Sequence, residues 1–387
     1  MEDGTAQGGA TAIDGIRWVR TPDDVAALAE RLRGVRAFGI DTESDSLWHF
    51  REKVCLVQIA APDGEVFLID TLAVRDLAPL APVVADPRDE KVIHGADYDV
   101  AVLRRDFGFA FRGLLDTMLA ARFLGYPSVG LAAVARHELG VVLSKGPRTS
   151  DWSRRPIDPV LVRYGAEDAR HLIPLRDRLV GKLAAAGREA WVREECDEVA
   201  AMPAAASKPA PADWQRAPGI RDLDPTARSV LRELFAVREQ VADRLDRPRF
   251  KVAMDEVLVA IARRMPADAA DLAPIRGLPG PVARRPAEWL DAVRRGIAAG
   301  PLDAPRPEHV RRRCTPCVSR RIGRIREWRD GAAARLGLEP GLVLPQRLVV
   351  QVAVANPTDA ESLSAVPGIR RWRVEALGAE LLRAIRT

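Results

Sequence analysis

The sequence predicts an α/β domain followed by an all-α region, and the spacing of its apolar residues carries this prediction. Short apolar runs typical of strands occur in the first part of the chain, at residues 35–41, 54–60, 65–70 and 91–95. Beyond about residue 220 the apolar spacing is almost entirely helical. Strands followed by mixed strands and helices are typical of an α/β domain, which we place at residues 15–200.

Local signals predict the other elements of this first domain. Residues 1–14 are expected to be a disordered lead-in. Thr21 and Pro22 mark a helix start, because threonine is a favoured N-cap residue and proline suits the first helical position. Further helices are expected over 74–85 and from Asp158-Pro159 to about residue 185. The α/β core should therefore close before residue 200.

The second half reads as small helical domains behind a linker. Residues 201–220 are rich in Ala and Pro, which favours a semi-rigid linker. Asp224-Pro225 then opens a helix that should reach about residue 245. Residues 242–296 and 334–385 share one order of helices and turns, including a Val-Pro-Gly or Leu-Pro-Gly turn. Two related helical domains, at 221–302 and 303–387, are therefore expected.

Composition limits the class of protein. A chain of 387 residues suggests two or three domains. A net charge of +5 fits a polyanionic partner. Only six of the basic residues are lysine and the rest are arginine, which suits bidentate phosphate contacts, although a base-composition bias of the genome would also produce this preference. The sequence has no run long enough to span a membrane and no signal peptide at its start, so we expect a cytoplasmic protein that contacts no membrane. Its four cysteines are too few and scattered for a disulfide framework.

Acidic residues occupy positions where they could converge. Asp41 and Glu43 end an apolar strand two residues apart, so their side chains should project from the same face. Asp99 follows another strand where a helix begins, although a plain N-cap role is the alternative and Asp97 fits that role better. Tyr164 and Asp168 are four residues apart on a predicted helix and should share one face.

These acids together predict a metal site. Carboxylate oxygens suit Mg²⁺ or Mn²⁺, which prefer oxygen ligands. Four carboxylates without cations would repel one another. Two such ions can stabilise the attacking and leaving oxygens of a phosphodiester.

The order of these motifs resembles the DEDD superfamily of 3′→5′ exonucleases. The motifs are IDTE (40–43), HGADYD (94–99) and YGAED (164–168). They resemble the tyrosine subtype, because the histidine subtype has a histidine where this chain has Arg163. Other segments resemble bacterial ribonuclease D, with HRDC-type domains after the linker: CLVQIA (55–60), residues 114–125, 131–141, Lys145, 150–157 and 214–239.

This resemblance implies a ribonuclease H-like domain with a mixed sheet, and the release of nucleoside 5′-monophosphates from RNA 3′ ends with two divalent cations. It implies that Asp41 bridges both ions and that Glu43 and Asp168 complete the first site. Asp99 would support the second ion, and Tyr164 would orient the attacking water. A phenol with an ordinary pKa near 10 is a poor base at neutral pH, which favours that orienting role.

Other residues are weaker candidates for RNA contact. The family often has an aromatic residue directly after Asp-x-Glu, where this chain has Ser44. Trp48, His49 or Phe50 could stack on the terminal base instead, or belong to the core. His94 belongs to the second motif, where it could contact nucleic acid or support Asp99 by a hydrogen bond.

The stretch 305–330 holds nine arginines and three acids, including the run Arg311, Arg312 and Arg313. It could neutralise phosphates, or be a solvated helix surface. The expected substrates are the 3′ ends of tRNA precursors or other stable RNAs, and no obligate protein partner is evident. A DNA-directed exonuclease of the same superfamily and an inactive nucleic-acid-binding scaffold are the alternatives.

Overall fold

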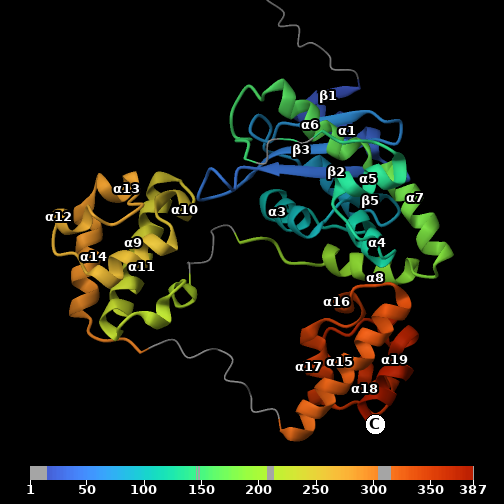
Figure 1. The fold of residues 1–387 in the computed structure, drawn as a ribbon. Helices are drawn as coiled ribbons and strands as arrows, with labels where there is room; N and C mark the ends of the chain where they lie inside the picture. The colour runs from blue at the N-terminus through green and yellow to red at the C-terminus, as the bar shows by residue number, and fades with distance from the viewer. Residues whose placement is uncertain (1–14, 145, 147–148, 207–212, 304–314, 387) are drawn as a thin grey trace, which may run out of the picture. The chain divides into compact units, whose positions relative to one another are not determined.

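The computed structural model describes residues 15–144, 146, 149–206, 213–303 and 315–386 (Figure 1). The lead-in at 1–14 lies outside the described residues. The chain forms two compact units, and they do not follow chain order. One unit combines residues up to 43 with 54–205 and those from 314 onward, and the other combines 44–53 with 206–313.

A six-stranded mixed sheet forms the centre of the first unit, as the fold class predicted. Its order is β1 (Ile16–Val19), β4 (Val66–Ile69), β3 (Val54–Ala60), β2 (Ala37–Ser44), β5 (Glu90–Ile93) and β6 (Leu114–Asp116). Strand β3 runs antiparallel to β4, whereas β1 and β4, β2 and β5, and β5 and β6 pair in parallel. All seven residues of β3 are buried, so both faces of the sheet are covered at its centre.

Helices flank the sheet on both faces (Figure 1). They are α1 (Pro22–Leu32), η1 (Ala78–Leu80), α2 (Ala81–Ala85), α3 (Asp97–Phe107), α4 (Thr117–Phe123), α5 (Leu131–Leu139), α6 (Pro159–Arg170), α7 (Leu172–Ala185) and α8 (Glu189–Ala200). Thr21 caps α1 with a capping box and Pro22 opens it, which confirms the predicted helix start.

Several predicted elements were wrong in extent. The helix expected over 74–85 begins only at Ala78 and is a short 3-10 turn followed by α2. The helix expected from Asp158 to about 185 is two helices, α6 and α7. Pro174 lies in the first turn of α7 and lacks the N–H that would continue the hydrogen bonding from α6. Strands β1 and β6 were missed, because β1 is only partly buried and contains the exposed Arg17, and β6 has three residues.

The second unit holds the first helical region. Its helices are α9 (Pro225–Leu245), α10 (Arg249–Val252), α11 (Asp255–Arg264), α12 (Ala269–Leu272), α13 (Gly280–Ala283) and α14 (Pro286–Ala298). Asp224 caps α9, which starts and ends as predicted. Trp289 is fully buried in the core of this region, and Phe50 from the β2–β3 segment joins the same core. Short 3-10 turns, η2 (Trp214–Arg216) and η3 (Ile220–Asp222), occupy part of the expected linker.

The second helical region belongs to the first unit. Its helices are α15 (Pro316–Leu336), α16 (Pro340–Val343), α17 (Gln346–Ala355), α18 (Ala360–Ser364) and α19 (Arg371–Arg386). Trp372 stacks on Trp191 of α8 with ring centroids 4.6 Å apart, and it makes a T-shaped contact with Phe123 of α4. Glu195 of α8 accepts hydrogen bonds from Trp372 Nε1 at 3.0 Å and Arg373 at 2.6 Å. The strands and helices of the α/β fold end with α8 at Ala200, but their hydrophobic core extends to Trp372 and Leu377 of α19.

Candidate active site

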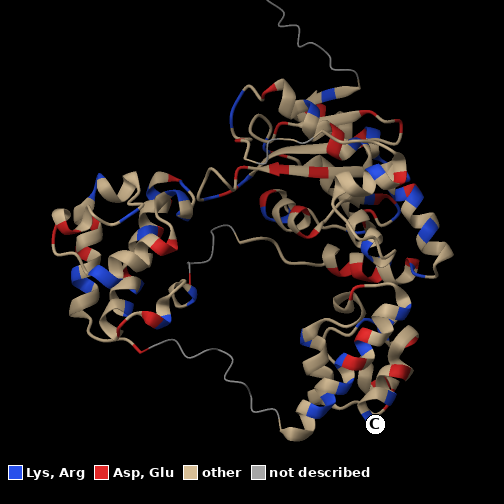
Figure 2. Ribbon diagram, viewed as in Figure 1, with Lys and Arg blue, Asp and Glu red and all other residues tan. Residues whose placement is uncertain are grey.

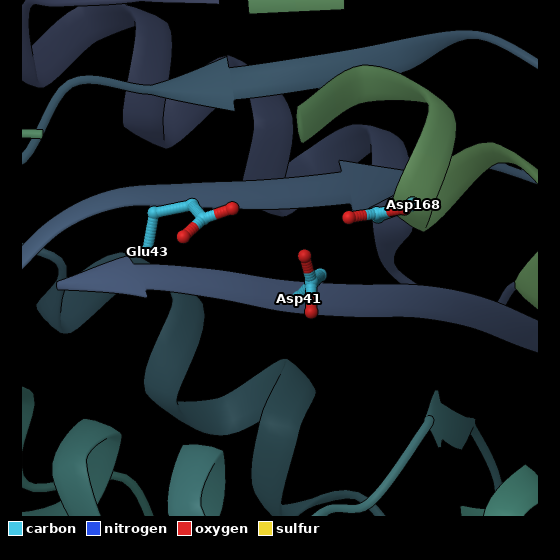
Figure 3. A group of neighbouring side chains, drawn as sticks. All are labelled: Asp41, Glu43 and Asp168. Atoms are coloured by element: carbon cyan, nitrogen blue, oxygen red, sulfur yellow. The ribbon is translucent and has the colours of Figure 1, made fainter. Parts of the chain in front are cut away.

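Three carboxylates meet between the sheet and helix α6. Asp41 and Glu43 project from β2, and Asp168 comes from α6 (Figure 3). One carboxylate oxygen from each of them lies within 4.8 Å of those of the other two. The i and i+2 positions on β2 therefore do share a face, although both residues lie within the strand, which continues to Ser44, and not at its end.

Burial and mutual repulsion raise the pKa values of these carboxyls. Burial, with the nearby charges of Asp168 and Asp99, raises the pKa of Glu43 to about 8. The pKa of Asp41 is raised well above its ordinary value by burial and then by Asp99, Glu43 and Asp168. Burial also raises the pKa of Asp168 to about 6, although the hydrogen bond from Tyr164 opposes this rise. A cation would relieve this repulsion, and the all-oxygen donor set fits Mg²⁺ or Mn²⁺.

Asp99 lies beside this group but outside it. It is 7% exposed in the first turn of α3 and accepts a hydrogen bond from Thr42 Oγ1. Burial raises the pKa of Asp99 to about 7, and the hydrogen bond from Thr42 opposes the shift. Its charge contributes to the raised pKa values of Asp41 and Glu43, so it lies within electrostatic reach of the three-carboxylate group. The residue expected as N-cap of α3, Asp97, is its first helical residue, and Ala96 is the N-cap.

Tyr164 points to the same group. Its hydroxyl donates a hydrogen bond to Asp168, four residues later on α6. Burial raises the pKa of Tyr164 above its ordinary value, and the negative charges of Asp168, Glu43 and Asp41 add to the shift. The phenol therefore keeps its proton at neutral pH and acts as a donor.

Close approaches at two glycines seat the helix that carries Tyr164 and Asp168. A Cβ on Gly165 would lie 2.7 Å from Nε2 of Gln58, a fully buried residue of β3. A Cβ on Gly39 of β2 would lie 3.1 Å from the Ala169 carbonyl oxygen. Larger residues would push α6 off the sheet and move Asp168. The sequence carried one unused signal for this, because glycine is costly inside a helix and needs a reason to be there.

Asp116 fixes the turn that leads into α3, and sequence reasoning missed it. Its carboxylate accepts hydrogen bonds from the backbone N–H groups of Gly95 at 2.9 Å and Ala96 at 3.0 Å. The same carboxylate caps α4 by accepting from Met118 and Leu119. Both elements are therefore tied to one buried side chain, which sets where the first turn of α3 begins.

Of the weaker candidates, His94 has a different partner from the one expected. Its Nδ1 lies 2.9 Å from Thr117 Oγ1 and its Nε2 is buried, whereas the side-chain hydrogen bond of Asp99 is with Thr42. Burial lowers the pKa of His94. The ring is therefore neutral at physiological pH, and one nitrogen is bound to Thr117 while the other is buried, which gives no support to a contact with RNA.

The three aromatic candidates after Glu43 have separate roles within the second unit. Phe50 is 7% exposed and belongs to the core of the first helical region. His49 Nδ1 lies 2.6 Å from Asp246 Oδ2. Trp48 has the ammonium of Lys251 3.3 Å from its ring centroid. The run Arg311, Arg312 and Arg313 and also Lys145 lie outside the described residues.

Comparisons with known proteins agree with this architecture. A family model described as 3′-5′ exonuclease matches residues 16–184, and an HRDC domain model matches twice, at 227–293 and 319–385. Ribonuclease D of Pseudomonas paraeruginosa is 32% identical over 96% of this chain and 97% of its own length. The catalytic core of RRP6 from Trypanosoma brucei is 28% identical, with a TM-score of 0.68 over 74% of this chain and 80% of its own. Escherichia coli RNase D shares the fold, at 24% identity and a TM-score of 0.70 over 96% of this chain and 98% of its own.

The fold and the carboxylate group therefore define a 3′-5′ exonuclease that uses a divalent metal and acts on nucleic acid. The chain belongs to the ribonuclease D family, and it is a 3′→5′ exoribonuclease. Among the described helices, none is long and apolar enough to cross a membrane.

Proposed function

We propose that the carboxylates hold two divalent cations, Mg²⁺ or Mn²⁺. The observation that carries the proposal is the convergence of Asp41, Glu43 and Asp168 within 4.8 Å. Asp41 would bridge both ions, and Glu43 and Asp168 would complete the first site. Asp99, held by Thr42, would support the second. When bound, the ions supply Lewis acidity at the attacking and leaving oxygens of the phosphodiester.

The chain's own groups orient the reactants in this proposal. The Tyr164 hydroxyl donates a hydrogen bond to Asp168, which holds the phenol beside the carboxylates, where its oxygen orients the attacking water. Attack at the last phosphodiester releases a nucleoside 5′-monophosphate and leaves a 3′-hydroxyl on the shortened RNA. The close approach of Gly165 to Gln58 sets the distance between α6 and the sheet, and this distance places Tyr164 and Asp168 beside Asp41 and Glu43.

The substrates we propose are the 3′ ends of tRNA precursors or other stable RNAs, in the cytoplasm. Relatives named ribonuclease D and the HRDC matches support an RNA substrate. The domain boundaries we propose are 15–200 for the exonuclease, 201–220 for the linker, and 221–302 and 303–387 for the helical domains. In this proposal Trp48 and the run Arg311–Arg313 remain candidates for RNA contact.

The described arginines of α15 give less support to a phosphate-binding face. Figure 2 shows basic and acidic residues interspersed along the helical regions. Arg324 donates to the Ile385 carbonyl at 2.7 Å, Arg321 donates to the Ala353 carbonyl, and Arg335 pairs with Glu380 at 2.7 Å. These arginines tie α15 to its neighbouring helices, so any phosphate contact by the basic stretch falls to its other arginines.

Labelled RNA tests direction and metal use together. A 5′-labelled single-stranded RNA should shorten in single-nucleotide steps with Mg²⁺ and stay intact in EDTA. A circular RNA should remain uncut, and a DNA strand of the same sequence should be degraded more slowly. Faster hydrolysis of the DNA would support the DNA-directed alternative, and no hydrolysis of either would support an inactive scaffold.

Titration of the full chain with Mn²⁺ tests the number of ions. Calorimetry should show two ions per chain in the wild type and a loss of both in Asp41→Asn, because Asp41 is proposed to bridge them. A single ion in the wild type would contradict the two-ion arrangement while leaving the exonuclease activity in place.

A further inference from the structure

The segment that follows the catalytic strand is built into the second compact unit. Residues 44–53 begin with Ser44, the last residue of β2, and pack on the end of α9. Asp246 Oδ1 accepts hydrogen bonds from the backbone N–H groups of Phe50 at 3.0 Å and Arg51 at 3.3 Å. Arg51 also binds Asp243, with its Nε and Nη2 at 2.9 and 2.6 Å from one carboxylate oxygen. The segment is therefore held in place on this unit.

A cavity of about 640 Å³ lies between this segment and helices α10 and α11. Phe50 and Pro248 form buried parts of its wall. Phe250 and Met254 also line it, and they are 52% and 56% exposed. Exposed apolar side chains in a cavity favour a ligand that removes them from water. The cavity therefore favours a ligand with an apolar face.

The charged groups of the cavity argue against a phosphate. Glu52, Asp255 and Glu256 line it on the acidic side. Its arginines are already engaged, because Arg238 binds Asp255 at 2.5 Å and Arg249 binds Glu239 at 2.8 Å. The first of these pairs also neutralises Asp255, so the excess negative charge of the lining comes from Glu52 and Glu256. Carboxylates accept hydrogen bonds from N–H groups and repel anions. The matching ligand is flat, neutral and carries N–H donors, which describes a nucleobase.

The covalent chain limits how far one wall of this cavity can lie from the reaction centre. Ser46 lines the cavity and follows Glu43 by only three residues. Three residues of extended chain span at most about 10 Å. The wall at Ser46 therefore lies within a short reach of the metal-binding carboxylates, wherever the rest of the second unit lies.

We propose that this cavity takes one unstacked base of the RNA, close to the 3′ end, with Phe250 as the stacking surface. The proposal rests on RNA being the substrate of the carboxylate site. Stacking of a base on an aromatic side chain is tolerant of sequence, because every base has a flat face, whereas the carboxylates favour bases with amino groups. The cavity would thus hold the strand in register near the 3′ end while chemistry occurs at the carboxylates.

A substrate scan combined with one substitution tests the proposal. Binding of the full chain to a 5′-labelled single-stranded RNA is measured in EDTA, which prevents hydrolysis, with one abasic nucleotide placed at each position in turn from the 3′ end. At one position near that end, the abasic nucleotide should raise Kd by about 5- to 150-fold. Phe250→Ala should raise Kd for the intact RNA by a similar factor. In this variant an abasic nucleotide at that one position should cause no further rise in Kd, while abasic nucleotides at the other positions should act as they do in the wild type.

Ile297→Ala is the matched control, because Ile297 is a 46% exposed apolar residue of α14 that does not line the cavity. It should bind the intact RNA like the wild type and keep the full abasic penalty. The proposal is overturned if Phe250→Ala keeps the abasic penalty at every position, or if it binds intact RNA like the wild type. Failure of the wild-type protein to degrade RNA would instead contradict RNA as the substrate of the carboxylate site. Failure of the base-binding proposal can therefore be told apart from failure of the proposed function.

Discussion

The two HRDC regions share one helical plan but are integrated into the molecule in different ways. The first builds a core around Trp289 and takes in Phe50 from the segment after the catalytic strand. The second places Trp372 against Trp191 and Phe123, so that it shares a core with the exonuclease domain. Two copies of one domain can thus do different work. The second completes the catalytic unit, and the first offers a cavity beside the path of the chain from Glu43.

The largest expected effect comes from removal of the second HRDC region, because that region shares a core with the exonuclease domain. A chain ending after residue 303 would expose Trp191 and Phe123 and leave Glu195 without Arg373. We expect this truncation to unfold at a lower temperature or to aggregate, because a large apolar contact and a partly buried ion pair are lost together. Thermal unfolding followed by circular dichroism would measure it. An unchanged Tm would show that the second region is only an appendage.

A matched pair of tryptophan substitutions should separate the two regions at smaller cost. Trp372 is 2% exposed and Trp289 is fully buried, and each lies on the helix that closes its own region. Replacing either by alanine should cost roughly 3–5 kcal/mol of unfolding free energy. Trp372→Ala should destabilise the unit that contains the carboxylates, and Trp289→Ala should destabilise the other unit. Hydrogen exchange measured residue by residue would show in which unit the amide protons lose protection. Equal loss of protection in the exonuclease domain from both variants would contradict the division.

Divalent metal should stabilise only the unit that contains the carboxylates, and more strongly at higher pH. The pKa values of Asp168, Asp99 and Glu43 are raised to about 6, 7 and 8. Protonation of these groups therefore favours the folded metal-free protein, and that stabilisation is lost as pH rises through this window. Mg²⁺ competes with these protons, so the Tm increase that it produces should grow between pH 6 and 8. At about 100 times its Kd, a bound ion adds about 2.7 kcal/mol.

That Mg²⁺ effect should vanish in Asp41→Asn. A Tm increase of the same size at both ends of the pH window would mean that carboxylates other than these bind the metal.

The smallest effect concerns the contact between the β2–β3 segment and α9. Asp246→Asn keeps the side chain's shape and tolerates the left-handed backbone at this position, where φ is 45°. It should weaken the hydrogen bond with His49 and cost about 1 kcal/mol or less. Hydrogen exchange at Phe50 and Arg51 should become faster, while Asp291→Asn, which removes an exposed pair with Arg294 on α14, should leave it unchanged. Unchanged exchange in Asp246→Asn would show that Phe50 alone holds the segment.

The sequence could predict the acids but not everything that places them. Two local periodicities, two on a strand and about four on a helix, predict that Asp41 shares a face with Glu43 and that Tyr164 shares a face with Asp168. The resemblance to the exonuclease motifs brought these pairs together as one site. The fold class and the start of α9 at Asp224 rest on similar local signals.

Contacts between distant segments were not predictable in this way. Thr42 reaches Asp99 across 57 positions, and Asp116 fixes the entry to α3 from a strand of three residues. The same holds for the second HRDC region, because Trp372 meets Trp191 only after the chain has passed through the whole first region. Such contacts leave no periodic pattern in a single sequence.

The most direct test of the central claim is the turnover of Asp41→Asn and Asp168→Asn on a 5′-labelled single-stranded RNA at saturating Mg²⁺. Each change keeps the side chain's shape but removes the charge that holds a cation, so kcat should fall by more than about 100-fold, the upper range for loss of an outer-shell partner of a metal ligand. Asp97→Asn, an acid in the first turn of α3 that no metal role requires, should keep wild-type turnover. Near wild-type kcat in Asp41→Asn would contradict the assignment of the carboxylate group as the active site.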